Sequence, residues 1–105
     1  MSYTYFTTVS NDYNMDDGGS IGFSTYLIDC SGGSITLSLT SSPWEGLTFC
    51  FMRTDNNVLN SLTINSNGDT HTINGETSKT LLINNCAKVL FTGSEWFMCL
   101  NSITI

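Results

Sequence analysis

Short runs of alternating hydrophobic and polar residues repeat along this chain, and turn-forming residues separate them. The clearest run covers residues 34–39, where Ile35, Leu37 and Leu39 lie on one face of an extended segment and serine and threonine on the other. Further extended segments are predicted at residues 3–9, 22–29, 47–53, 61–64, 70–73, 76–84, 87–92 and 95–100. No window of about a dozen residues has sustained helical spacing, so the pattern predicts an all-β protein.

The turns between these segments favour antiparallel pairing. Asn74 and Gly75 separate two strand-like runs, and an Asn-Gly pair suits the type I′ turn of a hairpin because both central residues take positive φ. Short strands with a turn about every ten residues are typical of a small antiparallel β-sandwich or β-prism, jelly-roll-like in its connections. The spacing of about nine to ten residues between Ile64, Ile73 and Ile83 leaves a short β-helical winding as the alternative.

The length of 105 residues is enough for one domain with one modest core. Residues 21–105 are predicted to form this single β domain. Residues 1–20 are predicted to be an N-terminal extension followed by a polar loop, because residues 11–20 are rich in Asp, Asn and Gly. The extension, which contains Tyr3 and Tyr5, is expected to dock on a neighbouring protein.

Two of the predicted strands, residues 47–52 and 96–100, carry apolar side chains on both faces. A strand that is apolar on both faces needs a second cover, because a two-layer subunit leaves one face of each sheet in water. Large apolar side chains left exposed together mark an interface. We therefore expect a homo-oligomer. The predicted contact residues are Tyr3, Tyr5, Leu47, Phe49, Phe51, Met52, Trp96, Phe97 and Met98.

The chain has three basic and nine acidic residues, and its formal net charge is −6 at pH 7. Nucleic-acid binding depends on a cationic surface that releases counterions, so nucleic acid is excluded as a partner. Attachment to an anionic membrane surface is excluded for the same reason. No apolar run approaches the roughly 20 residues of a membrane span, so no membrane insertion is predicted. The first residues also lack the basic and apolar regions of a signal peptide.

The four cysteines, Cys30, Cys50, Cys86 and Cys99, show neither a C-x-x-C motif nor zinc-ligand spacing. Cys50 and Cys99 lie inside apolar runs, where a free cysteine behaves as a small hydrophobic residue. We therefore expect free buried thiols, which fit assembly in a reducing compartment. Two disulfides, in any of three connectivities, are the alternative.

No group of residues in the sequence has catalytic spacing. Residues 12–18 begin like a calcium-binding loop, but the sixth and twelfth positions of that motif hold Asp17 and Phe23. His71 is the single histidine, and no serine or cysteine motif provides a nucleophile for it. The carboxylates Asp29, Glu45, Asp55, Glu76 and Glu95 are scattered in or beside predicted turns. We therefore predict a protein that is not an enzyme and uses no metal or cofactor.

Trp44 is a candidate ligand-binding residue, because it follows the single proline in a predicted turn. An exposed aromatic side chain in neutral polar surroundings can stack on a sugar ring or anchor an interface. A carbohydrate- or receptor-binding β module with a glycan as its ligand is therefore the alternative function.

The order of the segments between about residues 26 and 100 resembles a β module of bacteriophage tail fibres and of structural proteins of large double-stranded DNA viruses. The matching segments are Ile35-Thr36-Leu37-Ser38-Leu39, residues 43–46, residues 47–52, Arg53-Thr54-Asp55, Leu62-Thr63-Ile64, Ile73-Asn74-Gly75 and Gly93-Ser94-Glu95-Trp96. The sequence departs from the family pattern at Thr40, where the family usually has proline, and in being a lone module rather than the end of a long fibre.

The resemblance implies a non-enzymatic structural protein of the virion, assembled in the host cytoplasm. A lone module fits a minor capsid or cementing subunit better than a complete fibre. Its partners would be other capsid or fibre proteins. Modules of this kind are often trimeric, so a trimer is the homo-oligomer that the resemblance favours.

Overall fold

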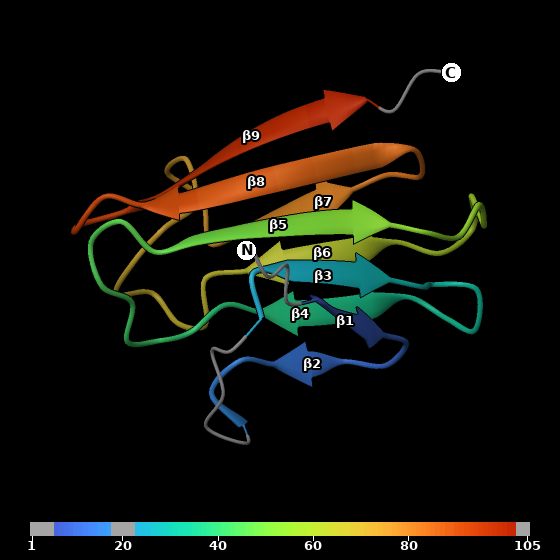
Figure 1. The fold of residues 1–105 in the computed structure, drawn as a ribbon, viewed down its shortest axis with the longest axis horizontal. Helices are drawn as coiled ribbons and strands as arrows, with labels where there is room; N and C mark the ends of the chain where they lie inside the picture. Colours follow the sequence, from blue (N-terminus) through green and yellow to red (C-terminus); the bar gives the residue numbers. More distant parts are fainter. Residues whose placement is uncertain (1–5, 18–22, 103–105) are drawn as a thin grey trace, which may run out of the picture.

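The computed structural model describes residues 6–17 and 23–102, and within these ranges the protein is all-β, with nine strands in two sheets (Figure 1). The five-stranded sheet contains, in spatial order, β1 (Phe6–Val9), β3 (Thr25–Ile28), β5 (Thr48–Arg53), β8 (Asn85–Phe91) and β9 (Trp96–Ser102). The four-stranded sheet contains β2 (Tyr13–Asn14), β4 (Ile35–Ser38), β6 (Leu62–Asn65) and β7 (Ser78–Leu81). A search of the described ranges for a helix long and apolar enough to cross a membrane finds none.

From β1 to β6 the chain passes back and forth between the two sheets, and strands of successive passes pair in parallel. In one sheet β1 pairs with β3 and β3 with β5, and in the other β2 pairs with β4 and β4 with β6. Strands β7, β8 and β9 pair antiparallel with their neighbours. The expectation of antiparallel sheets is therefore wrong for the pairings among the first six strands, and both sheets are mixed.

Parallel stacking of successive passes is the pairing expected of a β-helical winding, but the isoleucines that suggested it are not equivalent in the fold. Ile64 lies opposite Leu37 in a parallel pair, whereas Ile73 forms isolated bridges with Glu76 and Trp96. Ile83 lies after β7, outside the strands. The true repeat joins β1, β3 and β5, whose paired residues Phe6, Thr25 and Cys50 are spaced too unevenly to show as a period.

Residues 6–9 and 13–14, within the stretch predicted to be an extension and a polar loop, form strands of the two sheets. β1 pairs with β3 along all of its residues, and β2 pairs with β4. Val9 and Met15 are buried in the common core. A strand as short as β2 gives no visible alternation, and for that reason the sequence predicted a loop there. Tyr3 and Tyr5 lie outside the described residues, so their docking stays a prediction.

One hydrophobic core lies between the sheets, and aromatic rings form its centre. The ring centroid of Phe49 lies 5.9 Å from that of Tyr26 and 6.0 Å from that of Trp96. The ring centroids of Trp96 and Phe91 are 5.2 Å apart. Such spacings are favourable for aromatic pairs. Phe49 and Trp96 are almost completely buried, so one face of β5 and one face of β9 are already covered within a single chain.

The predicted Asn74-Gly75 turn is confirmed. Both residues have positive φ, 50° and 85°, and Ile73 and Glu76 exchange backbone hydrogen bonds across the turn. The Asn74 side chain donates to the Met98 carbonyl (3.1 Å) and accepts from the Met98 N–H (3.0 Å). The turn therefore satisfies backbone groups of β9 that would otherwise face outward at the edge of the sheet.

A buried ion pair joins the loops at one end of the molecule. The Nε of Arg53 lies 2.9 Å from Oδ1 of Asp55, and both side chains are nearly inaccessible to solvent. Asp55 also accepts a hydrogen bond from the Cys30 N–H. Arg53 further donates to the carbonyls of Leu81, Asn57 and Asn60. The pair thus links the chain after β3, the loop after β5 and the end of β7.

Acid should destabilise the fold through its hydrogen-bonded carboxyls. Hydrogen bonds from Arg53, Ser41 and Ser31 lower the pKa of Asp55, Asp16 and Asp29, respectively. A carboxyl with a depressed pKa in the folded state stabilises the fold above its unfolded pKa of about 4, and this stabilisation is lost as pH falls.

Urea denaturation at a series of pH values should therefore give a constant free energy of unfolding near neutral pH and a decline below about pH 4. The Asp55→Asn variant should show a shallower decline, because the carboxyl that contributes most to the acid destabilisation is then absent. An acid limb equally steep in the variant and the wild type would exclude Asp55 as a source.

Candidate functional site

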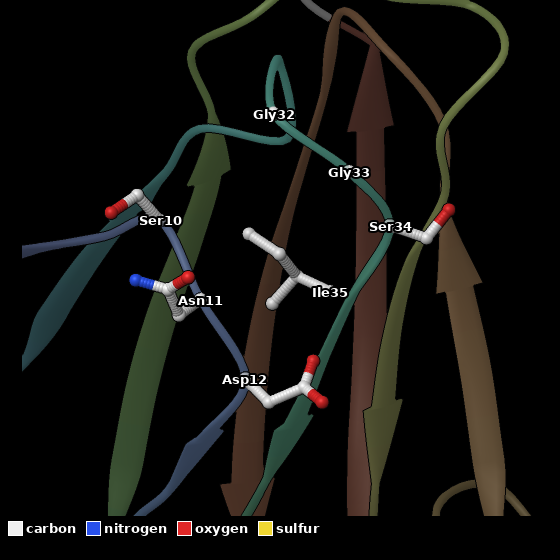
Figure 2. A pocket seen from close by; sticks show the side chains of 7 residues that line it. All are labelled: Ser10, Asn11, Asp12, Gly32, Gly33, Ser34 and Ile35. Carbon is white, nitrogen blue, oxygen red and sulfur yellow. The ribbon is translucent and has the colours of Figure 1, made fainter.

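A polar hollow of about 410 Å³ lies where the connection from β1 to β2 runs beside the connection from β3 to β4. Figure 2 shows that its side chains do not converge: Ser10 and Asn11 point to one side, and Ser34 points to the other. The carboxylate of Asp12 already accepts a hydrogen bond from the Thr36 N–H. This hollow therefore lacks the convergent polar groups typical of a ligand site.

Four of the five carboxylates singled out in the sequence, Asp29, Asp55, Glu76 and Glu95, are used in separate local contacts. Asp55 pairs with Arg53, Glu76 pairs with Lys79, and Glu95 accepts hydrogen bonds from the Thr72 hydroxyl and the Gly75 N–H. Asp16, in the stretch that begins like a calcium loop, binds Thr40, Ser41 and Asn67. In the described part of the chain, no three His, Cys, Asp or Glu side chains are grouped as metal ligands.

His71 packs against its neighbours instead of facing a nucleophile. Its ring lies edge-on to Phe91, with centroids 4.9 Å apart, and Nδ1 is 3.3 Å from the Ser94 carbonyl oxygen. Both contacts hold the turn between β8 and β9 against the segment before Ile73. The contacts of His71 therefore indicate a structural role for this side chain.

The side of the five-stranded sheet that faces away from the core is a candidate contact surface, here called the outer face. Along each strand every second side chain lies on this face, and no carboxylate is among them. Phe97 is 50% exposed and Leu90 is 42% exposed. The side chains of the outer face are Phe6, Thr8, Thr25, Leu27, Thr48, Cys50, Met52, Cys86, Lys88, Leu90, Phe97 and Cys99.

An apolar groove of about 380 Å³ crosses one end of the outer face. Leu90, Phe97, Met98 and Cys99 line it together with Thr48, Asn74 and Lys88. The strand register places Thr48, Leu90 and Phe97 side by side across β5, β8 and β9. Most of the groove is therefore formed by the sheet, and Asn74 of the Asn74-Gly75 turn completes it.

The predicted contact residues divide between the core and the outer face. Met52 and Phe97 lie on the outer face, where a partner can reach them. The others among the described residues are buried between the sheets and serve the core, although Met98 also lines the groove: Leu47, Phe49, Phe51, Trp96 and Met98. The sequence showed that both faces of β5 and β9 are apolar, but not which face is inside.

Comparison with models of known protein families and with curated proteins finds no match for this chain.

The four cysteines are free, as predicted, but only Cys30 is buried. Burial raises the pKa of the Cys30 thiol and also that of Cys50. Cys50, Cys86 and Cys99 all lie on the outer face, and Cys99 is the exposed one. The sequence predicted buried thiols, but three of the four cysteines lie on the outer face.

Alkylation with iodoacetamide should modify Cys99 first, Cys50 and Cys86 more slowly, and Cys30 only when the protein unfolds. The order follows because the thiolate is the reactive form and must be accessible. Peptide mapping by mass spectrometry over a time course measures it. Modification of Cys30 in the folded protein at the rate of Cys99 would contradict the described packing.

Trp44 lies in the turn between β4 and β5 and is 56% exposed, as expected. The turn is closed by a hydrogen bond from the Leu47 N–H to the Trp44 carbonyl (3.0 Å), and the Gly46 N–H donates to the Phe91 carbonyl (2.8 Å). Trp44 is thus held at the end of β8 that lies beyond Leu90.

Proposed function

We propose that this chain is a non-enzymatic structural subunit that acts through protein–protein contacts made by the outer face. The role is that of a virion protein of the minor capsid, cementing or fibre-like kind, with other capsid or fibre proteins as partners. The observation that carries it is the outer face, on which Leu90 and Phe97 are exposed and none of the described side chains is a carboxylate. Exposed apolar surface of this kind is typical of an interaction site.

The fold suits this role because sheet strands hold the contact side chains in place. In this proposal the two mixed sheets form a β-sandwich whose first six strands wind as a short β-helix, and the ion pair of Arg53 and Asp55 holds the loops at one end. A surface built on sheet strands presents its side chains at fixed positions, so a partner loses little free energy in ordering them. Phe97 and Leu90 lie side by side on β9 and β8, at one end of this fixed surface.

Co-sedimentation with virus particles from which the chain has been removed tests the proposal. The wild type should pellet with the particles, and Phe97→Ser should weaken this binding by about tenfold or more, because it removes a large apolar contact. The matched control is Leu59→Ser, since Leu59 is 89% exposed in the loop after β5, away from the outer face. Failure of the wild type to bind, or equal weakening by both variants, would refute the proposal.

A glycan-binding module is the second candidate function, and the exposure of Trp44 favours it. An exposed tryptophan offers a ring face on which a sugar can stack. A glycan array should then give hits for the wild type that Trp44→Ala abolishes, while Phe97→Ala retains them. An array without hits, or hits unchanged in Trp44→Ala, would remove this candidate.

A further inference from the structure

Lys88 is the one basic side chain without a carboxylate partner in the described part of the chain. The sequence has three basic residues, and the structure pairs Arg53 with Asp55 and Lys79 with Glu76 (3.0 Å). Lys88 is exposed on the outer face, between Cys50 and Cys99. A single cation thus lies on an apolar face of a chain whose net charge is −6.

Glu45 lies beside the turn that follows β8, past Leu90 along that strand. It follows Trp44 in the turn that the Gly46 N–H ties to the Phe91 carbonyl. Its Oε1 lies 3.3 Å from the position that a Cβ on Gly93 would occupy, which places it beside the turn after β8. Glu45 is exposed, and within residues 6–17 and 23–102 no hydrogen bond or ion pair engages its carboxylate.

These residues follow one another in a fixed order along β8. Lys88 precedes Leu90 by two residues, about 7 Å along the strand. Leu90 and Phe97 lie side by side in the middle, and Glu45 lies past Phe91 at the far end. The apolar centre therefore has a cation on one side and an anion on the other. A rotation of 180° about an axis through Leu90 and Phe97 exchanges the two ends.

We propose that two copies of this chain associate through their outer faces about such a two-fold axis. Leu90 and Phe97 of each copy pack against those of the other, and Lys88 of each copy pairs with Glu45 of its partner. In a two-fold contact the same surface of each copy takes part, so the Lys88–Glu45 pair occurs twice. The inferred dimer rests on the proposed function, because it uses the same surface and names a second copy as its occupant.

Charge favours a second copy on this face over any other part of the surface. Two chains with a net charge of −6 each repel one another, and among the nine carboxylates only that of Glu45, at the end of the outer face, takes part in the contact. Two outer faces thus meet with the least like-charge repulsion, and the Lys88–Glu45 pairs fix the register. The contact makes a dimer, which differs from the trimer that the resemblance favours.

Sedimentation velocity of the full chain, from about 1 to 500 µM in low salt with a reducing agent, tests the dimer. The wild type should show a monomer–dimer equilibrium. Lys88→Glu and Glu45→Lys should each raise the dimer Kd by about tenfold or more, because the symmetric contact then contains two like-charge pairs. The double variant Lys88→Glu/Glu45→Lys should return the Kd to within about threefold of the wild type. Thermal melting should confirm that each variant folds.

Two features of the design separate pairing from a general charge effect. Glu45→Lys changes the net charge from −6 to −6 + 2 = −4, so weaker repulsion alone would tighten the dimer, whereas a lost pair weakens it. Lys79→Glu makes the same charge change as Lys88→Glu but lies on β7 of the other sheet, and it should leave the Kd unchanged.

A wild type that stays monomeric throughout, a trimer mass, a swap that fails to restore the Kd, or an equal effect of Lys79→Glu would each overturn the dimer. The proposed function is judged separately by particle binding. A monomeric wild type whose particle binding depends on Phe97 would remove only the dimer. A dimer that behaves as expected but never binds particles would remove only the virion role.

Discussion

Asp55→Ala should lower the free energy of unfolding by about 3–5 kcal/mol, because it leaves the buried guanidinium of Arg53 without its counter-charge. Arg53 is 4% exposed, and Asp55 contacts both its Nε and its Nη2. Removing Asp55 also takes the acceptor from the Cys30 N–H. Urea denaturation followed by tryptophan fluorescence measures the change, since Trp96 is buried in the core.

The control for this substitution is Asp29→Ala, in the same group of loops. Asp29 is exposed and accepts a hydrogen bond from the Ser31 N–H, so its loss should leave the free energy of unfolding almost unchanged. A cycle with Arg53→Ala should give a double variant that is less destabilised than the sum of the single variants, because the two side chains interact directly. Equal effects of Asp55→Ala and Asp29→Ala would show that the ion pair does not hold the loops.

Phe49→Ala should destabilise the protein by about 3–5 kcal/mol, because it opens a cavity in the centre of the core. Phe49 is 1% exposed, and its ring contacts those of Tyr26, Phe51 and Trp96. The measurement is again the free energy of unfolding in urea.

Phe97→Ala is the matched control, since it makes the same substitution on a strand of the same sheet but on the outer face. Its expected effect on the isolated chain at low concentration is within about 1 kcal/mol. If Phe97→Ala destabilised the monomer as much as Phe49→Ala, the outer face would be part of the core, and it would not be a free contact surface.

The positions of most strands could be predicted from the sequence, because alternation records which residues face a core. Residues 34–39 and 61–64 were expected to be strands, and the structure has β4 and β6 there. The Asn74-Gly75 turn was predictable because few residues tolerate positive φ at two successive positions. These are local properties of the chain.

Strand pairing and the division into inner and outer faces could not be predicted in the same way. A half-buried strand alternates identically whether its neighbour is parallel or antiparallel, so the winding of β1 to β6 left no distinct signal. Arg53 and Asp55 are spaced like any polar loop residues, and only the fold brings Leu81 and Cys30 to them. Lys88 gave no signal either, because its importance comes from the residues on the neighbouring strands.

The rate of Cys99 alkylation in the isolated chain at low concentration and in the native assembly tests the central claim most directly. Cys99 lies on the outer face next to Lys88 and is exposed in the free chain. If the outer face is the contact surface, assembly should slow the alkylation of Cys99 by about tenfold or more, because a covered thiol is inaccessible to the reagent. A rate that is the same in the assembly and in the isolated chain would contradict the claim.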